Sequence, residues 1–370
     1  MKIDSIDVYH VAMPMKAPWR TAFGEEHAID SIIVRMTGPG VVGWGESAPY
    51  RAPNFSPEWA AGGFALIRDW LAPALIGLEI TDSEDLQGRL RTFKGNPFAK
   101  GALDCAWWDA RAKSMDTPLW RLIGGHAQTV PVGADIPVQT SQGELIEAVR
   151  HAVEAGFGRV KLKFRRTVPI KAVAGVREAF PSMPMHIDCN CGFTLDDAPL
   201  FEELDQLELA MIEQPLAYDD LIDHARLQER LQTPICLDES IPSPERARKA
   251  IAIGACGSIN IKVGRVGGLT GALTTRQLCV DHGMDYWIGG MLESALGQGP
   301  SMALASLDIG RYPSDIFPSS RLYSQDLSEP EIVLADPPSV RIPDVAGCGF
   351  TPNPDRLAAC TIAHERITTR

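Results

Sequence analysis

The sequence predicts an α/β protein in which an α+β segment precedes a parallel sheet, and a (β/α) barrel is favoured over an open doubly wound sheet. The hydrophobic pattern of the sequence changes near residue 128. After this point short apolar runs alternate with amphipathic stretches of helical period. About eight such runs follow, and none is succeeded by the glycine-rich loop that binds phosphate in open sheets. The stretch GRVGGLTG (264–271) has the wrong spacing for that loop and predicts a tight turn from strand to helix. The chain has 370 residues, 45% of them hydrophobic, which is enough to fill a large core.

Before residue 128 the pattern is that of a mixed segment. The stretches DSIIVRM (30–36) and VVGWGES (41–47) predict antiparallel strands on either side of the turn at 38–40. SEDLQGRL (83–90) and AKGALDCAWWDARAKSM (99–115) predict helices.

After residue 128 the apolar runs predict buried, parallel strands with helices between them. Helix boundary signals support this alternation. Ser141 and Glu144 have capping-box spacing before one helix, and Gly156 is placed to end it. Ser243-Pro244 supplies an N-cap and a first-turn proline for another helix, which Gly254 can close.

Charge and cysteine content narrow the function classes. With 35 basic and 47 acidic residues the net charge is -12, which argues against binding nucleic acid or an anionic membrane and favours a small-molecule partner. Asp4 and Asp7 interrupt any apolar signal core at the start, and no stretch stays apolar for the ~18 residues that a spanning helix needs. The 8 cysteines form no CxxC pair, which is typical of reduced thiols. We therefore expect a cytoplasmic protein.

Ionisable residues recur at the ends of the predicted strands. In a barrel of parallel strands such ends share one rim, where active sites are built. Neighbouring strands lie ~4.8 Å apart, so three consecutive carboxylates come within reach of one ion. The intervals between these residues are 25, 25, 25 and 24 positions, and the residues are Lys163, Asp188, Glu213, Asp238 and Lys262.

Three carboxylates without histidine predict an all-oxygen site that suits Mg²⁺ or Mn²⁺ and does not suit zinc. Three buried negative charges on adjacent strands would each cost several kcal/mol without a compensating cation. A single acid at a strand end is more often a helix cap or a loop salt bridge, but five groups in phase with the repeat are hard to explain in that way.

Lys161 and Lys163 lie on one face of the stretch GRVKLKF (158–164), which read alone also fits an edge strand with a wet face. With the other strand ends in view, we expect both lysines to face the barrel interior near the ion. A divalent cation and limited hydration disfavour an ammonium group, so a lysine there can act as a base. Lys262 would address the opposite face of the substrate. Two bases around a metal-bound carbon acid predict proton abstraction next to a carboxylate, with the metal holding the enediolate oxygens.

The strand-end motifs resemble those of the enolase superfamily, and within it the muconate-lactonising subgroup. The resemblance covers nearly the whole chain, and this superfamily is itself the well-known example of a lysine base that acts with Mg²⁺ on an enediolate. The helical stretch KGALDCAWWDARAKSMDTPLWRLIGG is also similar to the segment that joins cap and barrel in that family. The barrel motifs, in order, are KLK (161–163), DCN (188–190), IEQP (212–215), DES (238–240) and IKVGRVGG (261–268).

This resemblance implies an α+β capping domain over a (β/α)7β TIM-like barrel. The implied bounds are 1–128 for the N-terminal part of the cap, 129–320 for the barrel and 321–370 for a C-terminal return to the cap. Cap loops around PWRTAFGEE (18–26) and ESAPYRAPNF (46–55) would close over the substrate. The implied partner is a small-molecule carboxylate, and a homo-oligomer is expected.

The resemblance also implies roles for individual residues. Lys163 and Lys262 would be the acid/base pair, and Lys161 would touch the substrate carboxylate. Asn190 would lie beside the metal, and Gly290 and Met291 would contact substrate. The metal ligands would be Asp188, Glu213 and Asp238, with Mg²⁺ the expected ion and Mn²⁺ an alternative. Glu239 would sit behind them near Lys262, and Arg265 would help to keep Lys262 neutral.

GGMLESALG (289–297) and SDIFPSSRLYSQD (314–326) are most similar to the branch of N-succinylamino acid racemases and o-succinylbenzoate synthases. Arg265 resembles the arginine of racemase-competent members, so racemisation of N-acyl amino acids, N-succinyl ones above all, is the preferred expectation. Cys189, Cys191 and QGP (298–300) depart from the family pattern. The two cysteines are expected to be small packed thiols rather than metal ligands, and His186 is expected to be a packed polar residue.

Several alternatives stay open at this point. Within the lyase class, o-succinylbenzoate synthase or a muconate-type cycloisomerase would use the same lysines for β-elimination. A Schiff-base aldolase would also place a lysine at a strand end, without needing the three carboxylates. A non-catalytic carboxylate-binding protein could keep the metal and lose turnover.

Overall fold

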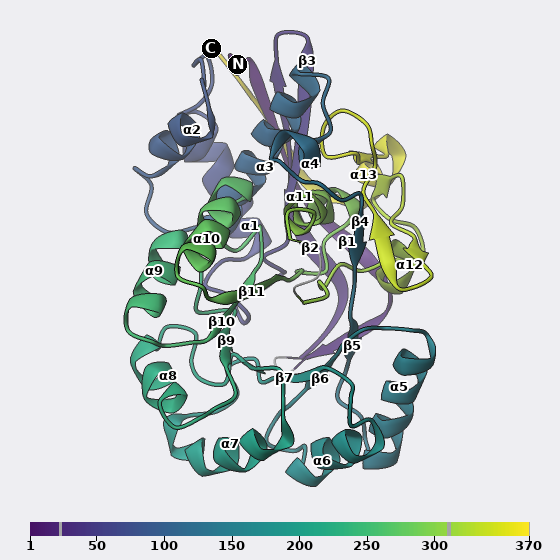
Figure 1. Ribbon diagram of the computed structural model, residues 1–370. Helices are drawn as coiled ribbons and strands as arrows, with labels where there is room; N and C mark the ends of the chain where they lie inside the picture. The colour runs from purple at the N-terminus through teal and green to yellow at the C-terminus, as the bar shows by residue number, and fades with distance from the viewer. Residues whose placement is uncertain (22–23, 309–311, 370) are drawn as a thin grey trace.

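The computed structural model describes residues 1–21, 24–308 and 312–369. Two sheets dominate it: a four-stranded antiparallel sheet and a seven-stranded parallel sheet surrounded by helices (Figure 1). Two further sheets are small, one of two strands and one of three. Among the described residues, no helix is both long and apolar enough to cross a bilayer.

The antiparallel sheet belongs to the cap and has the order β16-β1-β2-β3. Its strands are β1 (Ser5–Thr21), β2 (Gly24–Gly38), β3 (Val41–Ser47) and β16 (Thr361–Thr368). The predicted pairing of 30–36 with 41–47 is confirmed, because Gly38 and Val41 are partners beside the turn. The C-terminal strand β16 runs along β1, which brings the two ends of the chain together (Figure 1).

The cap also contains helices. They are α1 (Ala60–Leu66) with its π-helical continuation (Ile67–Leu71), α2 (Ser83–Leu90), α3 (Pro97–Ser114) and α4 (Leu119–Leu122). Of these, α1 and α3 pack on the sheet. The two predicted helices correspond to α2 and α3. Helix α3 lies directly on β3, because a side chain at Gly45 would meet the Ala106 backbone nitrogen at 2.5 Å. Glycine at this position permits the close approach of helix and strand.

The parallel sheet has the order β11-β10-β9-β8-β7-β6-β5, and each strand lies beside its sequence neighbour. One helical segment separates each pair, and these helices lie outside the strands (Figure 1). This is the βαβ pattern expected of parallel strands. The strands are β5 (Ala134–Ile136), β6 (Val160–Lys163), β7 (Met185–Asp188), β8 (Ile212–Glu213), β9 (Ile235–Leu237), β10 (Ser258–Ile261) and β11 (Asp285–Ile288). The helices are α5 (Gln142–Glu154), α6 (Ile170–Ala179), α7 (Ala198–Leu204), α8 (Leu221–Gln228), α9 (Pro244–Ala252), α10 (Leu269–Asp281) and α11 (Ala295–Ala305).

The segment around Ser314 occupies the eighth position. Its backbone nitrogen donates to Pro131 O at 3.1 Å and its carbonyl accepts from Gly133 N at 3.0 Å. On the other side, Asp315 N donates to Ile288 O at 2.9 Å. The segment therefore links β11 to the β5 side, and the predicted (β/α)7β barrel with an α+β cap is confirmed.

The remaining elements follow the barrel or flank it. They are β4 (Thr129–Pro131), α12 (Ser319–Leu322), β12 (Ser328–Glu329), β13 (Leu334–Ala335), β14 (Ser339–Arg341), β15 (Thr351–Pro352) and α13 (Pro354–Cys360), with short 3₁₀ turns at Leu195–Asp197 and Asp205–Leu207.

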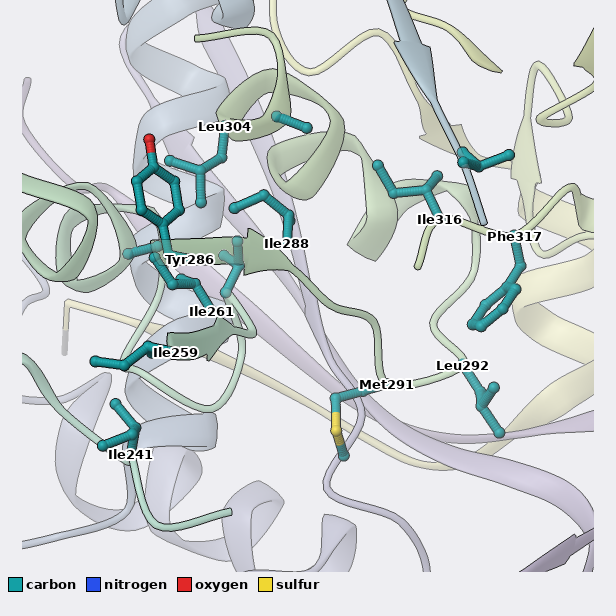
Figure 2. Packing of buried hydrophobic residues seen from close by; sticks show 14 of the residues in the cluster. Ile241, Ile259, Ile261, Tyr286, Ile288, Met291, Leu292, Leu304, Ile316 and Phe317 are labelled. Atoms are coloured by element: carbon teal, nitrogen blue, oxygen red, sulfur yellow. The ribbon is translucent and has the colours of Figure 1, made fainter. Parts of the chain in front are cut away.

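The barrel core is formed by apolar side chains that the strands turn outward against the helices. Ile259 and Ile261 of β10 and Ile288 of β11 are buried and lie together between strands and helices (Figure 2). Val160 and Leu162 take the same position on β6. Because successive strand residues alternate in direction, this outward packing turns the lysines of β6 inward.

The helix boundary signals work largely as expected. Ser141 accepts from Glu144 N at 3.2 Å before α5, and Ser243 accepts from Arg246 N at 3.2 Å before α9. In a capping box the Glu144 carboxylate would accept from the backbone N–H of Ser141. It accepts instead from Thr140 N, at 3.0 Å, one residue earlier in the chain.

Two buried carboxylates of the cap hold the barrel helices by their N-termini. Asp104 of α3 accepts from Thr270 N at 3.0 Å, and Glu46 of β3 accepts from Ser294 N and Gly297 N, both at 3.1 Å. Helix N-termini favour negative charge because their first N–H groups are unpaired. These contacts fix the cap on the side of the barrel where α10 and α11 begin.

Candidate active site

The register of the parallel strands brings the predicted strand-end residues together. Lys163 lies opposite Asp188, and Asp188 lies opposite Glu213. Asp238 follows the end of β9 and Lys262 follows the end of β10. The three carboxylates are at most 2% exposed and Lys262 is 6% exposed. All five residues therefore point into the same end of the barrel rather than into solvent.

Each predicted catalytic lysine lies against a different carboxylate. Lys163 Nζ donates to Asp188 Oδ2 at 2.6 Å, and Lys262 Nζ lies 2.8 Å from Asp238 Oδ2. Burial disfavours the ammonium form of Lys163, but the surrounding carboxylates, Asp188 first, together outweigh it and raise its pKa. This differs from the expected neutral amine. A neutral Lys163 requires another cation to compensate these carboxylates.

The carboxylates repel one another inside the barrel. Burial, and then the charge of Asp188, raise the pKa of Glu213 to about 8. Burial also works against ionised Asp188, but Lys163 and Lys161 outweigh it and lower its pKa. Burial, followed by the charge of Asp238, raises the pKa of Glu239 to about 8. This accumulation of negative charge is the electrostatic setting in which a cation binds.

Polar side chains behind the carboxylates hold them in place. Asn260 donates to Glu213 Oε1 at 2.7 Å, and His186 Nε2 lies 3.2 Å from Glu213 Oε2. The other ring nitrogen of His186 lies 2.8 Å from the Tyr312 hydroxyl. Burial, together with the charge of Arg159, lowers the pKa of His186 well below its ordinary value, so the imidazole is neutral. His186 is thus a packed polar residue, as expected, and it also orients a predicted metal ligand.

The donor set fits a hard divalent cation. All three predicted ligands are carboxylates, and the partners of Asp238 are the cations Lys262 and Arg265. Among residues 1–21, 24–308 and 312–369, no group of three or more His, Cys, Asp or Glu side chains is already arranged to hold a metal ion. The fit therefore rests on the chemistry of the three carboxylate ligands.

A cavity opens at this end of the barrel. It is open to solvent and has about 640 Å³ of space free of protein atoms, part of it outside the rim. The lining residues are Glu26, Ile29, Tyr50, Asn54, Phe55, Asp135, Lys161, Lys163, Asn190, Lys262, Gly290, Leu292, Asp315 and Phe317.

Most of the predicted contact residues lie in or beside this cavity. Asn190 and Gly290 line it, whereas Met291 is buried away from it, with its sulfur 3.5 Å from Arg265 Nη2. Glu239 accepts from Asn190 Nδ2 at 3.1 Å, and Arg265 donates to Asp238. Neither Glu239 nor Arg265 lines the cavity. Glu239 is bonded to Asn190 and Arg265 to Asp238, so both support predicted site residues from behind.

Lys161 has a different environment from the one expected. Its ammonium donates to Asp315 Oδ2 at 2.5 Å and lies 3.6 Å from Asp188 Oδ2 and 3.8 Å from Glu213 Oε2. Burial disfavours its charge, but the carboxylates around it, Asp135 first, raise its pKa well above the ordinary value. Lys161 is therefore a structural countercharge among the acids as well as a lining residue.

Cap loops cover the cavity. Tyr50 and Phe55 come from the loop predicted to close over the substrate, and Glu26 comes from the other predicted loop, of which residues 22 and 23 lie outside the described part. Tyr50, Asn190 and Leu292 all have positive φ angles, of 70°, 43° and 62°. Non-glycine residues rarely adopt this conformation, and it concentrates at functional sites.

Two acids of the cavity were missed from the sequence. Asp135 lies opposite Lys161 in register, and Asp315 bonds both Lys161 and Arg159. Asp135, Lys161 and His186 follow one another at 26 and 25 residues, so the strand repeat carried a signal for Asp135. Asp315 lies in the irregular eighth segment, where no repeat marks it.

Comparison with known proteins agrees with this architecture. Residues 4–124 match the N-terminal domain model of mandelate racemase and muconate lactonizing enzyme, and residues 144–356 match the enolase C-terminal domain-like model. The o-succinylbenzoate synthase of Geobacillus stearothermophilus is 39% identical over 351 residues, 95% of this chain and 93% of that protein. The N-succinylamino acid racemase of Thermus thermophilus is 36% identical over 349 residues, 94% of each.

Solved structures show the same fold. A crystal structure of an enolase superfamily member from Listeria innocua superposes with a TM-score of 0.96 at 34% identity, covering 100% of this chain and 99% of that one. A dipeptide epimerase from Cytophaga hutchinsonii, solved with Mg and a dipeptide, superposes with a TM-score of 0.87 at 24% identity, covering 99% of each chain. The chain is thus a member of the enolase superfamily, in the branch of o-succinylbenzoate synthases and N-succinylamino acid racemases.

Proposed function

We propose that this protein is a Mg²⁺-dependent enzyme that removes the proton next to a substrate carboxylate and, most specifically, racemises N-acyl amino acids such as N-succinyl ones. The observation that carries this proposal is the placement of Lys163 and Lys262. They come from β6 and from the end of β10, line one cavity, and lie against Asp188 and Asp238, two different members of the carboxylate trio. A pair of amines on separate strands can reach a bound carbon acid from two faces.

Asp188, Glu213 and Asp238 would hold the ion, with Mg²⁺ preferred and Mn²⁺ accepted. Enolase superfamily relatives use a divalent metal, and the dipeptide epimerase structure contains Mg. When bound, the ion supplies positive charge against the charge that develops on the substrate carboxylate as the proton leaves. It also compensates the carboxylates that now raise the lysine pKa, which favours the neutral amine that a base requires.

The lysines carry the proton. One uncharged amine takes the α-proton on its face and becomes an ammonium group. The ammonium on the other face returns a proton to the same carbon, which inverts its configuration and conserves the overall charge. Phe55 lies over this region, with its ring centre 5.6 Å from Lys262 Nζ, and shields it from water.

A second candidate reaction is o-succinylbenzoate synthesis by β-elimination. It is favoured by the relatives, because proteins named o-succinylbenzoate synthase are 39% and 38% identical to this chain. In that reaction one lysine would remove the α-proton and the leaving group would depart without a second proton returning to the same carbon. A Schiff-base aldolase would not need the three carboxylates that surround the lysines.

Deuterium exchange tests the proposal. In D₂O with Mg²⁺, each enantiomer of an N-succinyl amino acid should gain deuterium at the α-carbon and convert to the other. Lys163→Ala and Lys262→Ala should each abolish racemisation, whereas Lys171→Ala, at an exposed position of α6, should retain it. Racemisation by either active-site variant at the wild-type rate would disprove the two-base assignment. Formation of o-succinylbenzoate without racemisation would favour the second candidate.

Further expectations about the protein are proposals of the same kind. We propose that it works in the cytoplasm, which its 8 free cysteines support. The domain bounds at residues 128 and 320 and the homo-oligomeric state stay predictions.

A further inference from the structure

One buried amide side chain holds the turn that carries a predicted metal ligand. Gln214 follows Glu213 at the end of β8 and is 0% exposed. Its Oε1 accepts from Asp238 N at 2.9 Å and from Ser240 N at 3.1 Å. Its Nε2 donates to Ser240 Oγ at 2.7 Å and to Leu216 O at 3.1 Å. These bonds use both lone pairs and both hydrogens of the amide.

The partners of Gln214 show why an amide suits this position. Two of them are backbone N–H groups, which only donate, and one is a backbone carbonyl, which only accepts, so the orientation of the amide is fixed. An ionised carboxylate in its place could not donate to Leu216 O, and it would add a buried negative charge beside Asp238. The neutral amide holds the turn without changing the charge of the site.

The main chain of Gln214 reaches the neighbouring strand ends. Its N–H donates to Cys236 O of β9 at 2.8 Å, and its carbonyl accepts from Cys191 N, in the turn after β7, at 2.9 Å. Its φ angle is 38°, in the left-handed region that costs a non-glycine residue energy. Glycine would adopt this conformation more easily but could not form the side-chain bonds. Gln214 thus links the ends of β7, β8 and β9, where the three predicted ligands lie.

We propose that Gln214 is a positioning residue, whose amide fixes the turn after β9 so that Asp238 can share a divalent cation with the other two carboxylates. Lys262 and Arg265 pair with the Asp238 carboxylate itself, whereas Gln214 holds the backbone from which that carboxylate projects. Its hold therefore does not depend on the charges around the ligand. The inference rests on the proposed function, because the three carboxylates are the metal ligands proposed there.

The other end of β9 offers a matched control. Gln228, the last residue of α8, accepts from Ile235 N at 2.7 Å through its Oε1. Its Nε2 donates to Leu231 O at 3.4 Å and to Thr233 O at 3.3 Å. Ile235 is the first residue of β9, at the end opposite Asp238. Two glutamines therefore hold the two ends of one short strand, and only one of these ends carries a predicted ligand.

Titration with Mn²⁺, followed by electron paramagnetic resonance, separates a positioning role from a purely structural one. Gln214→Met and Gln228→Met each remove hydrogen bonds at an end of β9, so both variants should unfold at a lower urea concentration than the wild-type protein. Gln214→Met should also weaken Mn²⁺ binding at least about tenfold. Gln228→Met should retain the wild-type affinity for Mn²⁺.

The Ser240→Ala variant keeps the test decisive if Gln214→Met does not fold, because it removes only one partner of the amide. It should weaken Mn²⁺ binding roughly threefold, the effect of one hydrogen bond. Wild-type affinity in Ser240→Ala or in folded Gln214→Met, or an equal loss in Gln228→Met, would overturn the inference and leave the proposed metal site standing. Absence of Mn²⁺ binding by the wild-type protein would refute that metal site and the inference with it.

Discussion

The joint between cap and barrel depends on a glycine that has no room for a side chain. Gly268 precedes α10, the helix that follows Lys262, and has φ 101° and ψ -170°. A β-carbon there would lie 2.6 Å from Asp104 Cγ, and closer still to other atoms of the same side chain. Asp104 is fully buried and accepts hydrogen bonds from Thr270 N and from Thr270 Oγ1, so it cannot move aside without breaking them.

Gly268→Ala should therefore destabilise the protein in two ways. The backbone conformation is one that essentially only glycine adopts, and imposing it on alanine costs about 1–3 kcal/mol. Forcing the methyl group against Asp104 adds about 1–3 kcal/mol of overpacking. Gly267 is the matched control, because it also has positive φ, 90°, but nothing lies within 4 Å of its would-be β-carbon. Gly267→Ala should show only the backbone cost.

Urea unfolding followed by tryptophan fluorescence measures both variants. Gly268→Ala should unfold at a lower urea concentration than Gly267→Ala, by a difference equivalent to roughly 1–3 kcal/mol. Coincident unfolding curves for the two variants, or a wild-type curve for Gly268→Ala, would show that the contact between α3 and α10 is not as tight as described.

Three further predictions concern other parts of the molecule. Burial raises the pKa of Glu46 from 4.5 to about 7. Between these pH values the folded protein therefore binds more protons than the unfolded chain. The free energy of unfolding should fall as the pH rises through this window, by up to roughly 3 kcal/mol. Glu46→Gln should lower the free energy of unfolding, because it weakens the helix cap. It should also flatten the dependence of this free energy on pH, measured from pH 4.5 to 8. An unchanged pH dependence would refute the raised pKa of Glu46. Phe55→Ala, which uncovers Lys262 and Arg265, should lower kcat/KM by about tenfold, whereas Trp70→Ala, 63% exposed in the cap, should not. His186→Phe should weaken Mn²⁺ binding about 10–100-fold by releasing Glu213, and wild-type Mn²⁺ affinity in this variant would show that His186 only packs.

The repeat of the barrel explains why its rim could be predicted. Asp188 and Glu213 end successive short strands, so a constant interval in the chain becomes adjacency in the sheet. The same interval predicted Lys163 beside Asp188, where the structure has it. Helix starts at Ser141 and Ser243 were predictable because capping is local.

Contacts that depend on three-dimensional closure were less accessible. Asp315 reaches Lys161 because the irregular segment around Ser314 fills the eighth barrel position, and such a segment has no strand pattern to find. The hydrogen bond that Glu239 accepts from Asn190 was not predicted, because its direction depends on the turn after β9 rather than on strand alternation. The charge state of Lys163 could not be predicted from the sequence either, because it depends on how many carboxylates surround the amine in the folded protein.

Binding of Mn²⁺, followed by electron paramagnetic resonance, tests the central claim most directly. We predict one ion per chain, with affinity lowered at least about tenfold by Asp188→Asn, Glu213→Gln or Asp238→Asn and left unchanged by Asp219→Asn. Tight binding of Mn²⁺ that survives all three carboxylate substitutions, or no binding by the wild-type protein, would contradict it.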